Sequence, residues 1–255
     1  MHVARVGFAP VKGTRHTSYD AVRLDDHGGP VGDRAFCLVD VAGRRVLKTV
    51  QNPSLVAIRS VWDGARLTMT LPSGESASSA TTPTGEQVVC DYWGRPAPLA
   101  LVDGPHAALA SSYLGADVRL AAAPPGTVVY GGPVTLVSLA SLRALADDLG
   151  RPHLAREVAR FRPTVAVDDL EPWAEESWAG RTLRIGAATV RVHAPVPRCA
   201  VIDLDPVTGV ANAPLLKALA ARPDPAAPAA DLPFGVDAVV VSSGVVRPGD
   251  PVLLD

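Results

Sequence analysis

Glycine and proline divide this chain into short apolar runs, and that division restricts its possible folds more than any other feature. The 255 residues include 22 glycines and 24 prolines, mostly placed between apolar runs. Such spacing is typical of short elements joined by turns rather than of disorder. The apolar runs that we interpret as strands cover residues 2–10, 34–46, 55–72, 163–169, 181–196, 200–205, 238–244 and 250–254. Strands therefore dominate, and we predict a mainly β fold with α+β character.

Two turn-rich segments and one hairpin signal organise these runs. The Asp63-Gly64 pair between two apolar runs predicts a tight hairpin. Residues 74–88, GESASSATTPTGEQV, are poor in large apolar side chains and are predicted to form a loop. Residues 222–233, RPDPAAPAADLP, are predicted to form a second, mobile loop, because prolines disfavour regular pairing.

Three segments carry helix signals. Residues 138–149 have Ser138 as the predicted N-cap, leucines on one face and Gly150 as the stop. Shorter helices are predicted over residues 153–160 and 213–221. The runs of the first half suggest a small sheet or partial barrel, with a boundary near residues 95–105, so we predict a β-rich N-terminal domain and a second domain with short inserted helices. The predicted domains are residues 1–98 and 99–255.

Charge and hydropathy exclude several classes of protein. The formal net charge is −2 and the pI is about 6.3, so the overall balance does not attract nucleic acid or an acidic membrane surface. Any anion site must therefore be local. No run reaches the roughly 20 apolar residues that cross a bilayer, and the first residues, MHVARVGFAP, do not resemble a signal peptide. We expect a cytoplasmic protein without a membrane or nucleic-acid partner.

Three cysteines limit the redox chemistry that the chain can perform alone. Cys37, Cys90 and Cys199 lie too far apart in the sequence for the CxxC pairs of a zinc site, and they are too few for the four thiolates of an ordinary iron–sulfur cluster. A redox reaction here would need electrons from another protein.

The surroundings of Cys199 suggest chemistry. A predicted strand ends in Pro195 and Pro197, Arg198 and Cys199 follow, and a second strand is predicted to run on from residue 200. This arrangement places the thiol at a corner, with a guanidinium beside it that favours the thiolate. The alternative is that Cys199 is a small buried residue without reactivity.

Basic residues next to glycine or proline corners are a second candidate set. Lys12 follows Ala9-Pro10-Val11, Arg34 follows Gly32-Asp33, and Arg160 and Arg162 flank Phe161. Ammonium and guanidinium groups at corners suit a phosphate or a heterocycle rich in carbonyls and ring nitrogens. Taken singly, such a residue is more often a solvated or salt-bridged surface charge, so the four are of interest only as a set.

Several ordered motifs resemble the MOSC family. They are PVK, GDRAFCLVD, RFRP, ESW, PRC with DPVTG after it, and FG, GV and GDPV near the end of the chain. The resemblance extends over nearly the whole chain and is strongest to proteins with an N-terminal MOSC-type β domain, such as the amidoxime-reducing components. It implies a MOSC-type β-barrel with short inserted helices and a β-rich N-terminal domain.

The resemblance also implies a molybdenum cofactor, molybdopterin, and roles for individual residues. Cys199 would ligate molybdenum, and Arg198 would lie against the cofactor. Lys12, Arg34 and Arg162 would contact the pterin and its phosphate, since they occupy the PVK, GDR and RFRP positions. A high-valent metal accepts a soft thiolate, and an anionic cofactor tail needs fixed cations.

Three positions depart from the family's usual pattern. Gly13 stands where serine is common, and Thr164 stands where asparagine is common. The polar loop before the first predicted helix is Tyr130-Gly131-Gly132-Pro133, in which the glycine amides could replace side-chain donors for an anion. If the changes at Gly13 and Thr164 abolish binding, the chain has no cofactor.

The resemblance implies a molybdenum-dependent reductase that removes oxygen from N-hydroxylated small molecules. Its electrons would come from a separate flavin or iron–sulfur protein. One alternative is a sulfur-handling role, in which Cys199 carries a persulfide for cofactor maturation or biosynthetic sulfur transfer. Another is a cofactor carrier without turnover.

Overall fold

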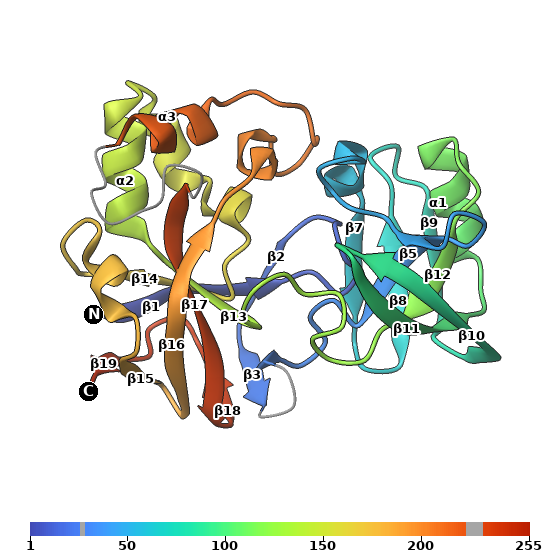
Figure 1. The fold of residues 1–255 in the computed structure, drawn as a ribbon, viewed down its shortest axis with the longest axis horizontal. Helices are drawn as coiled ribbons and strands as arrows, with labels where there is room; N and C mark the ends of the chain where they lie inside the picture. Colours follow the sequence, from blue (N-terminus) through green and yellow to red (C-terminus); the bar gives the residue numbers. More distant parts are fainter. Residues whose placement is uncertain (26–28, 223–231) are drawn as a thin grey trace.

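The computed structural model describes residues 1–25, 29–222 and 232–255, which form two bodies side by side (Figure 1). One body is built on an eight-stranded sheet, and the other contains a closed five-stranded barrel. Two further sheets have three strands each. The predicted mainly β fold with short inserted helices and a β-rich N-terminal domain is confirmed.

The eight-stranded sheet is antiparallel except where β13 pairs with β14. Buried valines alternate along its strands and form one apolar core. In spatial order its strands are β19 (Val252–Leu254), β15 (Thr182–Ile185), β16 (Ala188–Pro197), β17 (Pro233–Ser242), β13 (Val134–Ser138), β14 (Val165–Asp168), β1 (His2–Phe8) and β2 (Thr17–Tyr19). A small sheet beside it contains β18 (Gly244–Val246), β3 (Val22–Asp25) and β4 (Gly29–Pro30).

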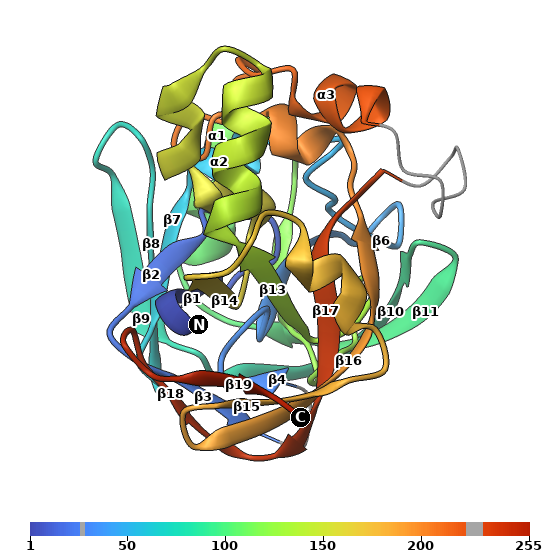
Figure 2. The same cartoon turned by 90° about the vertical axis from the view of Figure 1, so that its left-hand side faces the viewer.

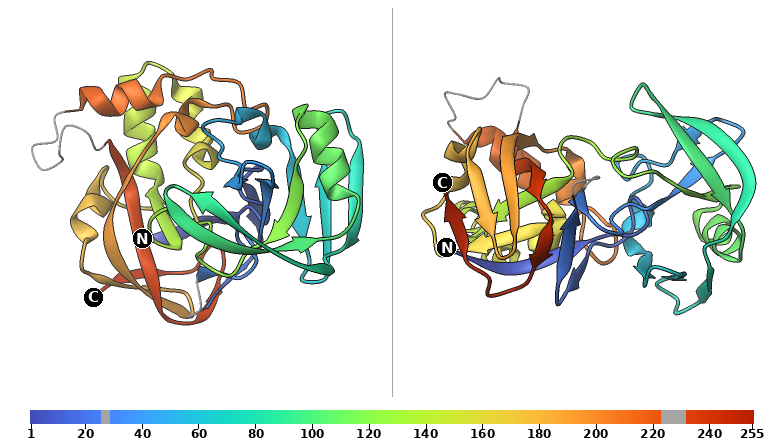
Figure 3. Two further views of the ribbon diagram at one scale, coloured as in Figure 1. Left: turned by 45° about the vertical axis from the view of Figure 1, so that its right-hand side comes forward. Right: turned by 90° about the horizontal axis from the view of Figure 1, so that it is seen from below.

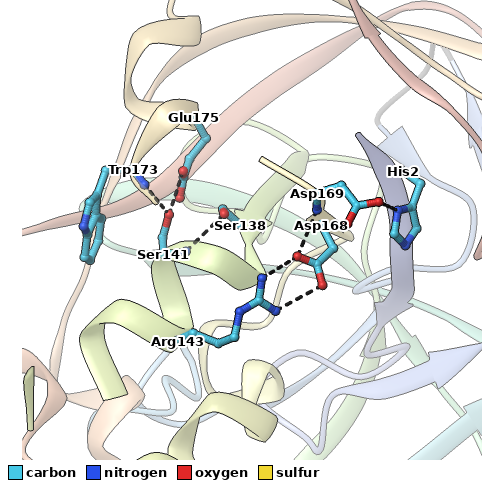
Figure 4. Close-up of polar contacts among 8 residues, drawn as sticks. All are labelled: His2, Ser138, Ser141, Arg143, Asp168, Asp169, Trp173 and Glu175. Carbon is cyan, nitrogen blue, oxygen red and sulfur yellow. Dashed lines mark hydrogen bonds and ion pairs between the residues drawn. The ribbon is translucent and has the colours of Figure 1, made fainter. Parts of the chain in front are cut away.

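Two α-helices lie at one end of this sheet, α2 (Leu139–Asp148) and α3 (Leu215–Ala221), as Figure 2 shows. The predicted N-cap of α2 is confirmed, because Ser138 Oγ accepts a hydrogen bond from Ser141 N. Ser141 Oγ in turn donates to the buried Glu175 carboxylate at 2.8 Å (Figure 4). The local sequence signals of α2 are therefore reinforced by a tertiary contact.

Two side-chain contacts shown in Figure 4 fix the end of β14. Arg143 of α2 donates two hydrogen bonds to the Asp168 carboxylate, at 2.6 and 3.1 Å. The His2 ring of β1 lies 2.7 Å from Asp169 Oδ2. Both contacts tie neighbouring elements to the strand that follows the RFRP motif.

The second body places a small barrel beside a three-stranded sheet and one helix. The closed barrel runs β10 (Pro83–Tyr92), β11 (Arg95–Val102), β12 (Arg119–Ala122), β5 (Phe36–Asp40) and β6 (Arg45–Val46). The sheet comprises β7 (Arg59–Trp62), β8 (Arg66–Thr70) and β9 (Ser76–Ala80), and α1 (His106–Leu114) packs near it. The Asp63-Gly64 hairpin is confirmed between β7 and β8.

The chain begins in the large sheet, crosses to the barrel and returns. Strand β1 pairs with β14, so the first residues belong to the sheet body (Figure 3). The predicted boundary between residues 98 and 99 lies within β11, which is hydrogen-bonded to both β10 and β12. These pairings place residues 99–122 with the barrel.

Two predictions for the N-terminal half are wrong. The predicted loop 74–88 contains β9 and the first part of β10, because small hydroxyl side chains pair across strands, as Thr68 and Ser78 do at 2.9 Å. The strand predicted from residue 55 starts instead as a 3₁₀ turn, η1 (Pro53–Ala57), with proline at its first position.

Two predictions for the C-terminal half are also wrong. The helix predicted over 153–160 is two 3₁₀ turns, η2 (Pro152–Arg156) and η3 (Val158–Phe161), separated at Glu157, whose backbone is not helical. The strand predicted over 200–205 is η5 (Ala200–Asp203). Most of the predicted loop 222–233 lies outside the described residues.

The two chain ends lie next to each other on the sheet body (Figure 1). Val252 N donates to Met1 O at 3.2 Å, and Val3 N donates to Asp250 O at 2.8 Å. Among the described residues, none of the helices has the length and apolar character needed to span a bilayer.

Candidate functional site

A cleft of about 310 Å³ lies where the two bodies meet, and both contribute to its walls. Cys199 lies in this cleft together with all of the basic residues singled out from the sequence. The sheet body and the segments leading to it contribute Lys12, Arg34, Thr135, Arg160, Phe161, Arg162, Val196, Pro197, Arg198, Cys199, Val201 and Ile202. The barrel side contributes Lys48, Thr49, Val50, Tyr92 and Trp93, together with Tyr130, whose ring lies beside that of Trp93.

Cys199 follows the bent end of β16. Beyond Val192, β16 pairs only with β17 and no longer with β15, so Pro195 and Pro197 lie where one edge of the strand needs no donor. The chain then turns into η5, whose first bond is donated by Ile202 N to Cys199 O at 3.2 Å. Cys199 is free and exposed, whereas Cys37 and Cys90 are buried in the barrel body. The predicted corner is present, formed by a strand and a 3₁₀ turn rather than two strands.

Arg198 holds this corner in place with its own side chain. Its guanidinium donates to Phe234 O through Nε at 2.8 Å and Nη2 at 2.5 Å, and to Phe161 O through Nη1 at 2.9 Å. Burial lowers the pKa of Arg198 to about 10. Arg198 therefore joins the three segments that surround Cys199, and its donors are largely committed to backbone carbonyls.

Arg160 and Arg162 flank Phe161 but have opposite environments. Arg160 is buried and donates to Glu157 Oε2 at 2.6 Å, Leu204 O at 2.6 Å and Asn212 Oδ1 at 2.7 Å. The guanidinium of Arg162 makes no hydrogen bond or ion pair with the described residues, although burial lowers its pKa to about 10. Only Arg162 is left to bind something in the cleft.

Lys12 and Arg34 bring two more cations to the same place. Burial, with Arg34 and Arg162 nearby, lowers the pKa of Lys12 to about 7. The Lys12 ammonium lies 5.4 Å from the centre of the Tyr92 ring. Arg34 forms an ion pair with Asp33 and donates through Nε at 2.7 Å. Lys12 is thus without an acidic partner at hydrogen-bond distance among the described residues, while Arg34 is partly neutralised.

The charges of the cleft do not balance. Asp33 partners Arg34, and Asp91 lies 3.6 Å from the Lys48 ammonium. Lys12 and Arg162 have no such carboxylate among the described residues. Two poorly solvated cations beside a free thiol favour an anionic ligand that can also bind sulfur.

The residues that depart from the family's pattern have structural roles. Gly13 has φ +88°, and a Cβ there would lie 3.0 Å from Leu55 Cδ1 and from Thr49 Oγ1. The Thr164 hydroxyl accepts from Thr135 N at 3.1 Å. Neither Gly13 nor Thr164 lines the cleft.

Gly131 and Gly132 attach the returning chain to β17. Gly132 N donates to Asp237 Oδ2 at 2.6 Å, so this amide is already bonded to a carboxylate of the protein and is not free for an anionic ligand. A Cβ on Gly131 would lie 2.8 Å from the same oxygen. The two glycines allow a close approach to Asp237, and Gly131 does not line the cleft.

The sequence reasoning missed the barrel side of the cleft. Lys48, Thr49, Trp93 and Tyr130 line it but share no motif with Cys199. One local signal could have indicated Trp93. The Trp93-Gly94 pair separates two extended runs and forms a two-residue turn, which exposes the side chain before the glycine.

Comparisons with known proteins match both halves of the chain. Residues 1–117 match the MOSC N-terminal beta barrel domain, and residues 122–253 match the MOSC domain. Molybdenum cofactor sulfurase 2 from Culex quinquefasciatus is 37% identical over 92 residues, which cover 33% of this chain and 12% of that protein.

Solved structures resemble the chain only loosely. The YuaD protein from Bacillus subtilis has 11% identity and a TM-score of 0.46, with 99% of this chain and 93% of that chain covered. YiiM from Geobacillus stearothermophilus has 18% identity and a TM-score of 0.35, with 49% and 56% covered.

Proposed function

Because this chain belongs to the MOSC domain family, whose N-terminal barrel domain it also contains, we propose that it binds a molybdenum cofactor in the cleft and reduces N-oxygenated small molecules. Membership of this family gives the chain a function associated with the molybdenum cofactor. The reduction, its substrate and the electron donor are our proposals.

The observation that carries the proposal is the exposed thiol of Cys199 beside cations that lack carboxylate partners. A molybdenum cofactor is anionic and has a metal that accepts thiolate sulfur. Lys12 and Arg162 supply charge that no described acidic residue neutralises at hydrogen-bond distance, and Cys199 supplies the sulfur. The donor set fits the cofactor in both respects.

Cys199 would hold the metal, while Arg162, Lys12 and Arg34 would bind the pterin and its phosphate. When bound, the cofactor supplies two-electron oxygen-atom transfer. Arg198 keeps the Cys199 corner rigid through Phe161 and Phe234 rather than offering its own donors. The Lys12 Nζ, with a pKa of about 7, can carry a proton at neutral pH and release it nearby.

The overall reaction consumes two electrons and two protons for each substrate. An N-hydroxylated compound, R–NHOH, becomes R–NH₂ and water, and the broken N–O bond takes up both electrons. The three cysteines of this chain are too few to hold an ordinary iron–sulfur cluster of its own. The electrons would therefore come from a separate flavin or iron–sulfur protein.

Metal analysis of the purified protein tests the proposal directly. The chain is produced in a host that synthesises the cofactor, and molybdenum and pterin are measured per protein. Near-stoichiometric amounts of both are expected, with turnover of an N-hydroxylated compound when a reduced dye supplies electrons. Absence of molybdenum and pterin would overturn the proposal, and their presence without turnover would favour a carrier.

A sulfur-transfer role is the second candidate, and the similarity to a protein named Molybdenum cofactor sulfurase 2 favours it. The exposed Cys199 thiol is accessible to a persulfide donor, from which it would take a sulfane sulfur and pass it to an acceptor. Trapping a persulfide on Cys199 in metal-free protein, with none on the buried Cys90, would support this role over the reductase.

A further inference from the structure

Two aromatic side chains at the cleft are exposed, contrary to the usual burial of such residues. Trp93 is 48% exposed and Tyr130 is 61% exposed, and no other aromatic residue is among the exposed large hydrophobic side chains of the described residues. Their ring centres are 5.9 Å apart with an interplanar angle of 59°. Both residues line the same cleft as Cys199. Exposed aromatic surface that gathers in a cleft is typical of a binding site.

Trp93 occupies a backbone position that its side chain does not favour. Tyr92 and Arg95 pair across the hairpin of β10 and β11, so Trp93 and Gly94 form a two-residue turn. Both have positive φ, +56° and +76°, as in a type I′ turn. Asparagine or aspartate is preferred before the glycine, and a bulky residue there is a genuine outlier. The left-handed backbone of this turn disfavours tryptophan, so its presence points to a role of the ring outside the turn itself.

The aromatic pair is held rather than left loose. Arg95 Nη2 donates to Val129 O at 2.7 Å, which joins the hairpin to the residue before Tyr130. On the other side of Tyr130, Gly132 N donates to Asp237 Oδ2 at 2.6 Å. Both rings therefore project from backbone that is anchored on either side.

A cation completes this wall of the cleft. The Lys48 ammonium lies 4.3 Å from the centre of the Trp93 ring and 3.6 Å from Asp91 Oδ2. Lys48 orients the indole, while Asp91 offsets its charge. The remaining surface is aromatic and close to neutral, which suits a flat, uncharged ring more than a strongly anionic ligand.

We propose that Trp93 and Tyr130 form a subsite that selects planar aromatic substrates and holds the ring while its polar group faces the Cys199 side of the cleft. This subsite refines the proposed reductase function and rests on it for the reaction, but not for ligand binding. The two rings bind the substrate without taking part in the chemistry, so they determine specificity.

Two hydroxamic acids test the subsite, because they share a polar head and differ in the ring. Benzhydroxamic acid is planar, and cyclohexanecarbohydroxamic acid is puckered. Dissociation constants are measured by calorimetry on the protein as purified from a cofactor-competent host, with its molybdenum content recorded. Any contribution of the metal to the shared head cancels in the ratio of the two constants.

The wild-type protein is expected to bind the planar acid about fivefold more tightly than the puckered one, the range of an aromatic contact. In a Trp93→Asn/Tyr130→Ser double variant the ratio should fall to about one, without a lower melting temperature. Val89→Ser, on the same hairpin but outside the cleft, is the matched control and should keep the wild-type ratio.

A wild-type ratio near one, or a ratio that survives the double substitution, would overturn the subsite. Molybdenum content separates this from the proposed function. A planar preference in protein without molybdenum would support the subsite and reject the reductase function. Bound molybdenum and turnover without a planar preference would support the reductase function and reject the subsite.

Discussion

The two walls of the cleft differ in how far their polar and aromatic groups are already bonded within the protein. On the sheet side, Arg198 and Arg160 donate to backbone carbonyls and to side chains of neighbouring segments. On the barrel side, Trp93 and Tyr130 leave much of their surface open. One wall fixes the position of the thiol, and the other leaves surface free for a ligand.

This difference teaches that basic residues near a reactive cysteine need not all bind the cofactor. Arg160 and Arg162 are two residues apart, yet the first is fully bonded and only the second is free. Substitutions on the sheet wall should therefore divide into those that reduce stability and those that reduce occupancy. Substitutions on the barrel wall should change selectivity.

The largest effect is expected at Cys199. Cys199→Ser should fold normally, because the residue is exposed, but lose reductase activity by about a thousandfold or more, since a hydroxyl is a poor ligand for a soft bond. Activity with a reduced dye and the molybdenum spectrum measure this loss. Cys90→Ser, buried in the barrel, is the control and should stay active despite losing about 1–3 kcal/mol of stability. Full activity of the Cys199 variant would contradict both the metal-ligand role and the persulfide role of this residue.

Arg198→Ala should mainly reduce stability. It removes the donors to Phe161 O and Phe234 O and leaves those carbonyls unpaired beside an apolar cluster. The free energy of unfolding in urea should fall by about 2–4 kcal/mol. A loss below about 0.5 kcal/mol, the level of an ordinary surface substitution, would contradict the anchoring role.

Arg162→Lys should reduce cofactor occupancy and spare stability. Lysine keeps the charge but not the planar fork of donors, so molybdenum content should fall about tenfold while the unfolding free energy changes by less than about 0.5 kcal/mol. The backbone at this position is left-handed, with φ +53°, and it strains arginine and lysine equally, so the substitution does not change that strain. Unchanged molybdenum content would show that Arg162 is only a structural charge.

The affinity of the cleft for an anion is expected to depend on pH because of Lys12. Its pKa of about 7 means that the ammonium is charged below that pH and neutral above it. Sulfate keeps its charge over this range. Its affinity for cofactor-free protein should therefore fall a few-fold as pH rises from about 6 to 8, because the loss of one charge–charge contact costs about 1 kcal/mol. Calorimetry measures this, and Lys12→Arg should flatten the profile.

The same shift makes the stability of cofactor-free protein depend on pH. Between about 7 and the ordinary value of 10.5, the unfolded chain binds a proton at Lys12 that the folded chain lacks. Stability should therefore rise with pH across that window. A flat stability profile in wild type would contradict the lowered pKa of Lys12.

The smallest effect is expected from Trp93→Asn alone. Asparagine suits the left-handed position before Gly94, while the contact with Lys48 is lost, so the unfolding free energy should change by between zero and a gain of about 1 kcal/mol. Thermal unfolding measures this change. A loss beyond about 1 kcal/mol would mean that the indole supports the barrel instead of serving a ligand.

The parts of the fold that could be predicted from the sequence are those with local causes. Helix α2 has its cap, apolar face and glycine stop within 13 residues, and the β7–β8 hairpin has its Asp-Gly turn. Strand β9 could not be predicted, because Ser76–Ala80 becomes extended only by pairing with β8. The 3₁₀ turn η5 also depends on a contact distant in the sequence, since Asp203 Oδ1 accepts a hydrogen bond from Leu216 N of α3.

The candidate site divides in the same way. Cys199 and Arg162 could be found, because each lies in a short motif, and the structure brings both into one cleft with Lys12 and Arg34. Gly13, Thr164 and Gly131 lie outside its lining. Trp93 and Tyr130 reach the cleft only because the chain leaves the sheet, closes the barrel and returns, a path that no local pattern encodes.

The adjacent chain ends have a consequence for how this protein can be rearranged. Because Met1 and Val252 are hydrogen-bonded to each other, a short peptide could join the ends without distorting the sheet. The molecule is therefore suited to circular permutation, with new ends opened at an exposed hairpin tip such as Gly64. By the same geometry it could be inserted as a cassette into a surface loop of a host protein, entering and leaving at one point.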